Sequence, residues 1–248
     1  MYLNCHSYYS LRYGMMSVEQ LVQGAAEAGE KCIAMTDINN STGIPEFAGE
    51  CIKKGIKPLA GIEFRNENDL LYIGIARNNE GLKELNEFLS AHNIDKTPLP
   101  FPAPDFSNVY IIYPLSGMPV RPLLENERVG IRPSEINSLM TIRNSAARNS
   151  MLLLLPVTFA SEDDIFVHKS LRAVDNNILL SHLKPSQCAL EDEFYLSAGK
   201  KDYLQSEHKW LIANTEKLMD DCSLDFDLNT LKNKKVFSAS RYDDRLLL

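Results

Sequence analysis

The chain has 248 residues, of which 44% are hydrophobic and 24% charged, and its formal net charge is -7. This composition is typical of a globular protein with one large core, and α/β barrels commonly reach this length as a single domain. The negative charge argues against a protein that holds DNA by broad neutralisation of phosphates, because such binding needs clustered lysine and arginine. The two short basic clusters, Lys53-Lys54 and Lys232–Lys235, are typical of a solvated surface.

The cysteines and the N-terminus indicate the compartment. The five cysteines are widely spaced and include no CxxC pair, which argues against a structural zinc site or a redox motif and favours free thiols in a reducing cytosol. The N-terminus lacks the features of a signal peptide, and the longest aliphatic run, Met151–Leu155, is strand-sized. We therefore expect a cytoplasmic protein with no membrane partner.

The first third of the chain alternates strand and helix signals. Ser17-Val-Glu-Gln20 has the form of a capping box, and it opens an amphipathic helix that Gly29 ends. Short apolar runs on either side predict buried strands. The elements expected here are strands 2–6, 32–35 and 56–64 and helices 17–29 and 44–54.

The same alternation continues toward the middle of the chain, and the last part is mainly helical. A proline-rich stretch, 97–104, is expected to be an ordered surface connection. Repeated strand–helix units predict parallel strands with right-handed crossovers, hence an α/β layer or barrel. The elements expected here are strands 70–76, 109–113 and 151–157 and helices 79–92, 161–174 and 208–219.

A possible metal site emerges from four polar residues near strand ends. Asn4 and His6 lie two apart on one strand and so share a face, while Asp37 and Glu63 each lie at the end of another strand. Imidazole and carboxylates suit Zn, Mn or Fe, which activate water for phosphoester hydrolysis. The same residues also allow a structural interpretation, in which Asp37 shapes a turn and His6 is a hydrogen-bonded core histidine.

Three motifs in order resemble those of the polymerase and histidinol phosphatase (PHP) family: Asn4–Leu11, Met35–Asn40 and Gly55–Glu63. Ala76–Gly81 is similar to a segment of the DNA polymerase III alpha subgroup, in the form found in Bacteroidetes. The resemblance covers nearly the whole chain and implies an α/β fold, a distorted (β/α)7 barrel. It places that barrel at residues 1–240 and takes residues 241–248 as the start of a segment leading to a polymerase body.

The resemblance also implies which side chains would bind metals in active members. His6 and Glu63 are kept, Asn4 stands at the first motif histidine, and Asp37 belongs to the second motif. A catalytic metal normally needs three protein ligands and an open position. We therefore expect a vestigial site with no metal cofactor and no catalytic residue. The resemblance also implies that several ligand positions are lost. These positions are occupied by Tyr13, Ile38, Leu71, Met118 and, beside Pro156, Thr158.

The resemblance implies a structural and subunit-docking domain of a replicative DNA polymerase. Its expected partners are the rest of the polymerase alpha chain and the proofreading exonuclease subunit, with DNA reached only through the full polymerase. That full-length chain would be a DNA-directed DNA polymerase, whereas no activity is expected of these residues alone. Two alternatives stay open: an active phosphoesterase or 3'-5' exonuclease that uses Mg, Mn or Zn, and a free-standing small-molecule phosphatase. No GxSxG, Walker A or GxGxxG motif supports another enzyme class.

Overall fold

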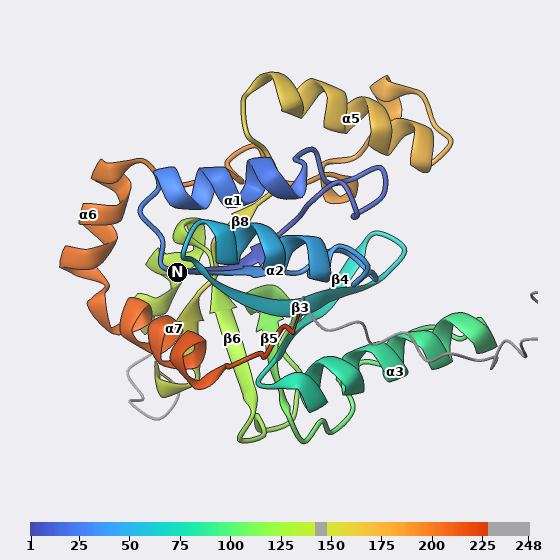
Figure 1. Ribbon diagram of the computed structural model, residues 1–248. Coiled ribbons are helices and arrows are strands. Elements are labelled where there is room, and N and C mark those ends of the chain that lie inside the picture. The colour runs from blue at the N-terminus through green and yellow to red at the C-terminus, as the bar shows by residue number, and fades with distance from the viewer. Residues whose placement is uncertain (142–147, 228–248) are drawn as a thin grey trace, which may run out of the picture.

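The computed structural model describes residues 1–141 and 148–227 (Figure 1). Within these residues eight strands form one curled sheet, in the order β7-β6-β5-β4-β3-β2-β1-β8. The strands are β1 (Tyr2–Cys5), β2 (Cys32–Met35), β3 (Lys57–Asn66), β4 (Asp69–Ala76), β5 (Val109–Pro114), β6 (Glu127–Ile131), β7 (Met151–Leu153) and β8 (Pro156–Val157).

Helices surround this sheet and follow local signals in the sequence. The capping box of Ser17 and Gln20 is confirmed at the start of α1, and Gly29 and Gly55 have the positive φ angles expected after helix ends. The described α-helices are α1 (Val18–Glu27), α2 (Ile44–Lys53), α3 (Asn79–Asp95), α5 (Asp163–Asp175), α6 (Ala198–Glu207) and α7 (Lys209–Asp221). Short 3-10 helices are η1 (Leu115–Gly117), η2 (Pro133–Thr141), η3 (Leu180–His182) and η4 (Pro185–Gln187).

The expected α/β class and barrel-like sheet are confirmed, but the sheet has eight strands rather than seven and they are not all parallel. Neighbouring strands are parallel within two groups, β8-β1-β2-β3 and β5-β6-β7. Strand β4 lies between the groups and runs antiparallel to both β3 and β5. The physical reason is the short connection between β3 and β4. Asn66 pairs with Asp69, so only two residues link the strands, and a parallel pairing needs a long crossover.

One segment brings the two edges of the sheet together. The expected single strand 151–157 is two strands, because β7 pairs with β6 at one edge and β8 pairs with β1 at the other. Leu154 and Leu155 alone separate them, and Leu154 N–H donates to the Ile131 carbonyl at 2.9 Å. The sheet therefore curls into a nearly closed barrel, with helices on its outer face in Figure 1.

The interior of this barrel is apolar, and an irregularity in β1 directs a polar side chain toward one end of it. The register between β1 and β2 shifts between Tyr2 and Cys5, as in a β-bulge. Leu3 consequently packs in the interior cluster while the next residue, Asn4, contacts Glu63. The other main members of the interior cluster are Ala34, Leu59, Ile73, Ile75, Ile112, Leu152 and Leu154.

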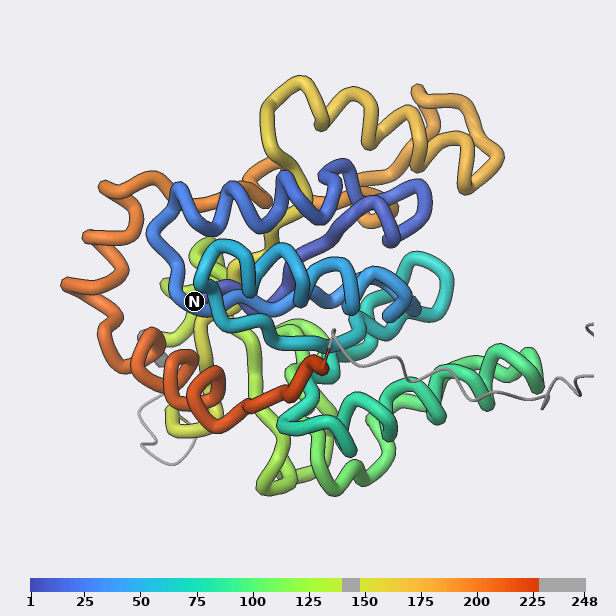
Figure 2. Tube along the Cα trace, viewed as in Figure 1, coloured from blue at the N-terminus to red at the C-terminus, as the bar shows by residue number. Residues whose placement is uncertain are grey.

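Two segments far apart in sequence meet above the carboxyl ends of the parallel strands. The loop between β1 and α1 lies beside α5, as the blue and gold parts of Figure 2 show, and Arg12 pairs with Asp175. In the described part of the chain no helix is long and apolar enough to cross a membrane. The predicted segment 241–248 and the cluster Lys232–Lys235 lie outside the described residues.

Candidate functional site

The structure brings the predicted site residues together at the carboxyl ends of β1, β2, β3 and β8. Asn4 and His6 come from β1 and the residue after its end, Glu63 from β3, and Thr158 follows β8. All four side chains are buried. The carboxyl ends of neighbouring parallel strands meet at one rim, which explains why motifs so distant in sequence converge here.

The Glu63 carboxylate is at the centre of this site, and both of its oxygens have hydrogen-bond partners. Oε2 accepts from Asn4 Nδ2 at 2.8 Å and lies 3.0 Å from His6 Nε2, and Oε1 accepts from Arg65 Nε. Burial alone would raise the pKa of Glu63, but the Arg65 guanidinium and His6 outweigh it and hold that pKa well below its usual range. Glu63 is therefore an ionised carboxylate held by three side chains.

Arg65 is part of the site, although it lies outside the three motifs that resemble the family. Its side chain is 9% exposed, and Nη2 donates to the Tyr13 hydroxyl at 3.0 Å. Burial would lower the pKa of Arg65, but Glu63 and Tyr13 raise it above its usual range. Strand alternation could have predicted this residue. Arg65 lies two positions after Glu63 on the same strand, so both side chains are on the same face.

Tyr13 and Ile38 form an apolar cover over the site. The Tyr13 ring packs edge-on against His6 and His168, at centroid distances of 5.2 and 4.9 Å. Ile38 packs against the cluster formed by Tyr13, Phe159 and Ala189. Two positions that the family resemblance assigns to metal ligands are thus occupied by a tyrosine and an isoleucine that pack in one cluster.

The Asp37 carboxylate faces the first loop of the chain. It accepts from Ser7 N–H at 2.7 Å, from the Ser7 hydroxyl at 2.7 Å and from the Ser10 hydroxyl at 2.6 Å. Ser10 Oγ in turn accepts from Ile38 N–H at 3.0 Å. Burial raises the pKa of Asp37, and the bonds from Ser10 and Ser7 oppose that rise. The side chain thus orders the loop that carries Tyr13.

Thr158 connects His6 to a second buried carboxylate. Thr158 Oγ1 lies 2.9 Å from His6 Nδ1 and donates to Glu193 Oε2 at 2.6 Å. The other Glu193 oxygen pairs with Arg132 Nη1 at 3.0 Å. Glu193 lies in a loop and Arg132 directly follows β6, and no sequence pattern predicts either as a site residue. One polar network thus runs from Glu63 to Arg132.

The remaining positions named from the resemblance lie away from this network. Leu71 packs on the side of β4 that faces α3, and its neighbour Leu70 lines the cavity instead. Met118 is exposed after η1. Pro156 lies in β8, where it pairs with Asn4 along the sheet.

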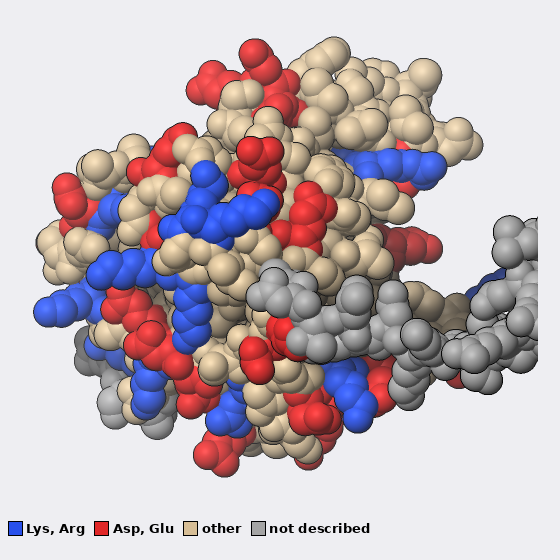
Figure 3. All heavy atoms as spheres, viewed as in Figure 1, with Lys and Arg blue, Asp and Glu red and all other residues tan. Residues whose placement is uncertain are grey.

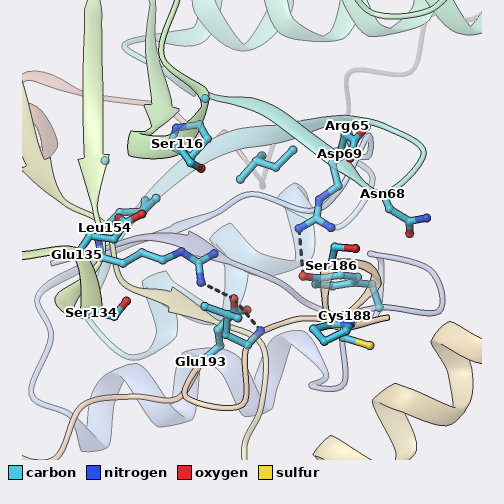
Figure 4. Close-up of a pocket in the computed structure, with 18 residues that line it drawn as sticks. Arg65, Asn68, Asp69, Ser116, Ser134, Glu135, Leu154, Ser186, Cys188 and Glu193 are labelled. Carbon is cyan, nitrogen blue, oxygen red and sulfur yellow. Dashed lines mark hydrogen bonds and ion pairs between the residues drawn. The ribbon is translucent and has the colours of Figure 1, made fainter. Parts of the chain in front are cut away.

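A cavity of about 580 Å³ opens beside the network (Figure 4). In Figure 4 the side chains of Arg65 and Glu193 approach it from opposite sides. Neither His6 nor Glu63 is among its lining residues. Charged groups of both signs line the cavity: Arg65, Arg132, Asp69, Glu135 and Glu193.

The residues present do not fit a catalytic metal. His6 and Glu63 are hydrogen-bonded to each other, and the second Glu63 oxygen is bound by a guanidinium. Within residues 1–141 and 148–227 no group of three or more His, Cys, Asp and Glu side chains is arranged to hold a metal ion. To reach the Glu63 carboxylate, a divalent cation would have to displace Arg65 from Oε1 or His6 and Asn4 from Oε2.

Curated relatives are DNA polymerase III alpha subunits, and their similarity is local. The subunit of Staphylococcus aureus strain Mu50 is 35% identical over 92 residues, and the match covers 36% of this chain and 9% of that protein. The subunit of Ureaplasma parvum serovar 3 is 32% identical over 88 residues, with the same two coverages. The chain therefore matches only a small part of the length of these relatives.

A solved structure and a family model complete the comparison. An amidohydrolase from Chromobacterium violaceum is similar over 71% of this chain and 84% of its own, with 14% identity and a TM-score of 0.31. The family model described as the PHP domain matches residues 3–231. Since that match spans most of the chain, this protein belongs to the PHP domain family.

Proposed function

We propose that this chain is a non-catalytic PHP domain that gives a replicative DNA polymerase of the polymerase III alpha type structural support and a docking surface. The observation that carries the proposal is the state of Glu63. Its carboxylate is fully buried, bonded to Asn4, His6 and Arg65, and absent from the lining of the neighbouring cavity. Both carboxylate oxygens thus already have partners within the chain, and Glu63 does not line the cavity through which a substrate would approach.

The relatives support the choice of partners. They are alpha subunits, and the matched region covers 9% of their length, so most of each relative lies outside it. We take the rest of a polymerase alpha chain as the main partner and the proofreading exonuclease subunit as a second one. DNA would be contacted only through the full polymerase, in the cytoplasm, and no metal cofactor is proposed for this domain.

An exposed apolar patch supports the docking role. It lies on α5 and the segment after it, and we call it the α5 patch: Phe166, Val167, Val174, Leu179, Leu180 and Leu190. Figure 3 shows few charged side chains over much of α5, whereas charges of both signs cover the helices below it. Clustered exposed apolar side chains usually mark a protein interface. We assign this patch to the polymerase body, because a covalently linked partner has a high effective concentration.

The test of the proposal is a hydrolysis assay on the purified chain. End-labelled single-stranded DNA and a chromogenic phosphate ester are each incubated with Mn, Mg or Zn. His6→Asn and Glu63→Gln serve as matched variants. We expect hydrolysis at the level of the protein-free control in all three proteins. Metal-dependent cleavage by the natural chain that a folded His6→Asn variant lacks would refute the proposal and support an active phosphoesterase or exonuclease.

A further inference from the structure

We propose that Arg65 is a built-in cation, which neutralises Glu63 from within the chain and makes this end of the barrel independent of divalent metal. The inference rests on the proposed function, since it concerns the same site. It follows from the mismatch between the residues present and the metal chemistry that the family resemblance implies.

The first step is charge. Glu63 is fully buried and Arg65 is 9% exposed, so neither group is neutralised by solvent. An ionised carboxylate in such a place is strongly unfavourable unless a partner charge lies against it. Asn4 supplies only a hydrogen bond, while the Arg65 guanidinium supplies a full positive charge through Nε. Arg65 therefore provides the charge that a metal would otherwise bring to this carboxylate.

The second step is the pocket that holds the guanidinium. Arg65 Cζ lies 4.5 Å from the centroid of the Tyr13 ring, and Nη2 donates to the Tyr13 hydroxyl. Such stacking over an aromatic face favours arginine in particular. The family resemblance puts a lost acidic ligand at Tyr13 and a lost histidine at Ile38, which packs in the same cluster. The residue at one lost ligand position thus holds the guanidinium, and the residue at the second packs in the cluster that contains Tyr13.

The third step is a second ion pair with the same design. Arg132 pairs with buried Glu193 at 3.0 Å, and Thr158 and His6 connect Glu193 to Glu63. Arg65 and Arg132 both line the cavity. Each of the two buried carboxylates in this network therefore has its own guanidinium, and the network is balanced without an added cation.

The test is a double-mutant cycle in the 248-residue chain, with Glu63→Gln, Arg65→Met and the two combined. Thermal unfolding is followed with a chelator present. We expect each single change to lower Tm by roughly 10 °C, because it leaves one buried charge without its partner. The double variant removes both charges, so it should be more stable than the sum of the single losses predicts. Additive losses would overturn the proposal.

An exposed pair provides the matched control. Lys83 and Glu80 lie 3.5 Å apart on α3, and both side chains are mostly exposed. The cycle of Glu80→Gln and Lys83→Met should therefore show almost no coupling. Should Arg65→Met fail to fold, folding of the double variant supports the proposal, and failure of the double variant as well overturns it.

A metal titration completes the test and separates it from the test of the proposed function. The Tm of the natural chain should be the same in chelator and in Mn²⁺, because Arg65 already neutralises Glu63. A rise in Tm with Mn²⁺ that Glu63→Gln abolishes would overturn the proposal. Metal-dependent hydrolysis that a folded His6→Asn variant lacks would defeat the proposed function and the role of Arg65 together. Additive losses in a chain without hydrolysis would defeat only the role of Arg65.

Discussion

The Tyr13 hydroxyl accepts a hydrogen bond from Arg65 Nη2 at 3.0 Å, and the same ring lies under the guanidinium at 4.5 Å from its centroid to Cζ. Tyr13 thus holds Arg65 in two ways, through an oxygen and through a π face. The two contributions can be separated by substitution, because phenylalanine keeps the ring and loses only the oxygen.

Tyr13→Phe should destabilise the chain by about 1–3 kcal/mol, because it leaves a buried arginine donor without its acceptor. Tyr13→Leu also removes the ring, so it should cost more. Urea unfolding measures both. Tyr203→Phe is the control, since the Tyr203 side chain is largely exposed, and no change is expected there. Equal stability of Tyr13→Phe and the natural chain would show that the hydroxyl does not hold Arg65.

Gly14 is a second position at which a substitution should destabilise the chain, because the loop between β1 and α1 brings it against the Ser7 backbone. A Cβ at Gly14 would lie 1.8 Å from the Ser7 carbonyl oxygen, which is backbone and cannot easily move. Gly14→Ala should therefore lower the free energy of unfolding by more than about 2 kcal/mol. Gly199→Ala in α6 meets no atom within 4 Å and should stabilise by up to about 1 kcal/mol. Chemical denaturation of the two variants checks the contrast.

His168 should make stability depend on pH. It is buried, Nδ1 donates to the Tyr13 carbonyl at 2.8 Å, and Nε2 accepts from Ala189 N–H at 2.9 Å. Burial lowers the pKa of His168 to about 4, and the bond to Tyr13 opposes that shift. The neutral form is thus favoured in the fold. Neutral His168 contributes fully to the free energy of unfolding above the unfolded-state pKa of about 6.5. This contribution is lost as the pH falls from there toward the pKa of His168 in the folded state.

Between pH 7 and 5 this loss should reach about 2 kcal/mol, in a range where most carboxylates stay ionised. Urea unfolding at the two pH values measures it, with His168→Gln as the variant in which the dependence should flatten. An identical pH dependence in the variant would assign the effect to another group.

The α5 patch should behave differently in the isolated chain and in a full polymerase. The exposed fractions of Phe166 and Val174 are 67% each, so Phe166→Ser with Val174→Ser should leave the isolated chain's Tm nearly unchanged. In a polymerase chain that contains this domain, the same pair should lower Tm, because it removes apolar contact with the body. Ile94→Ser, at an exposed position on α3, is the control. An unchanged polymerase Tm would mean that the body does not cover the patch.

Local signals predicted much of the fold, and long-range pairing explains where they failed. The capping box of α1 and the apolar runs of β1 and β2 act within a few residues, so they can be read directly. Glu127–Ile131 was missed, since this strand carries charged residues and is defined by its neighbours β5 and β7. The reversed direction of β4 follows from a two-residue connection, which alternation alone does not reveal.

At the site, too, local motifs could be predicted from the sequence and long-range contacts could not. Asn4, His6 and Glu63 meet because strand ends converge, and motif order was enough to predict that. Leu70 rather than Leu71 lines the cavity because the register between β3 and β4 shifts at Phe64 and Arg65, which a single sequence does not show. Glu193 reaches the site from a loop through Thr158, a contact between residues 35 positions apart.

The most direct test of a site closed by arginine rather than metal is the metal content of the purified natural chain. The chain is prepared without added metal or chelator, and Mn, Zn and Fe are measured by elemental analysis against protein concentration. The account predicts far less than one metal atom per chain, with no difference between the natural chain and a Glu63→Gln variant. One or more tightly bound atoms per chain, lost in the Glu63→Gln variant, would contradict it.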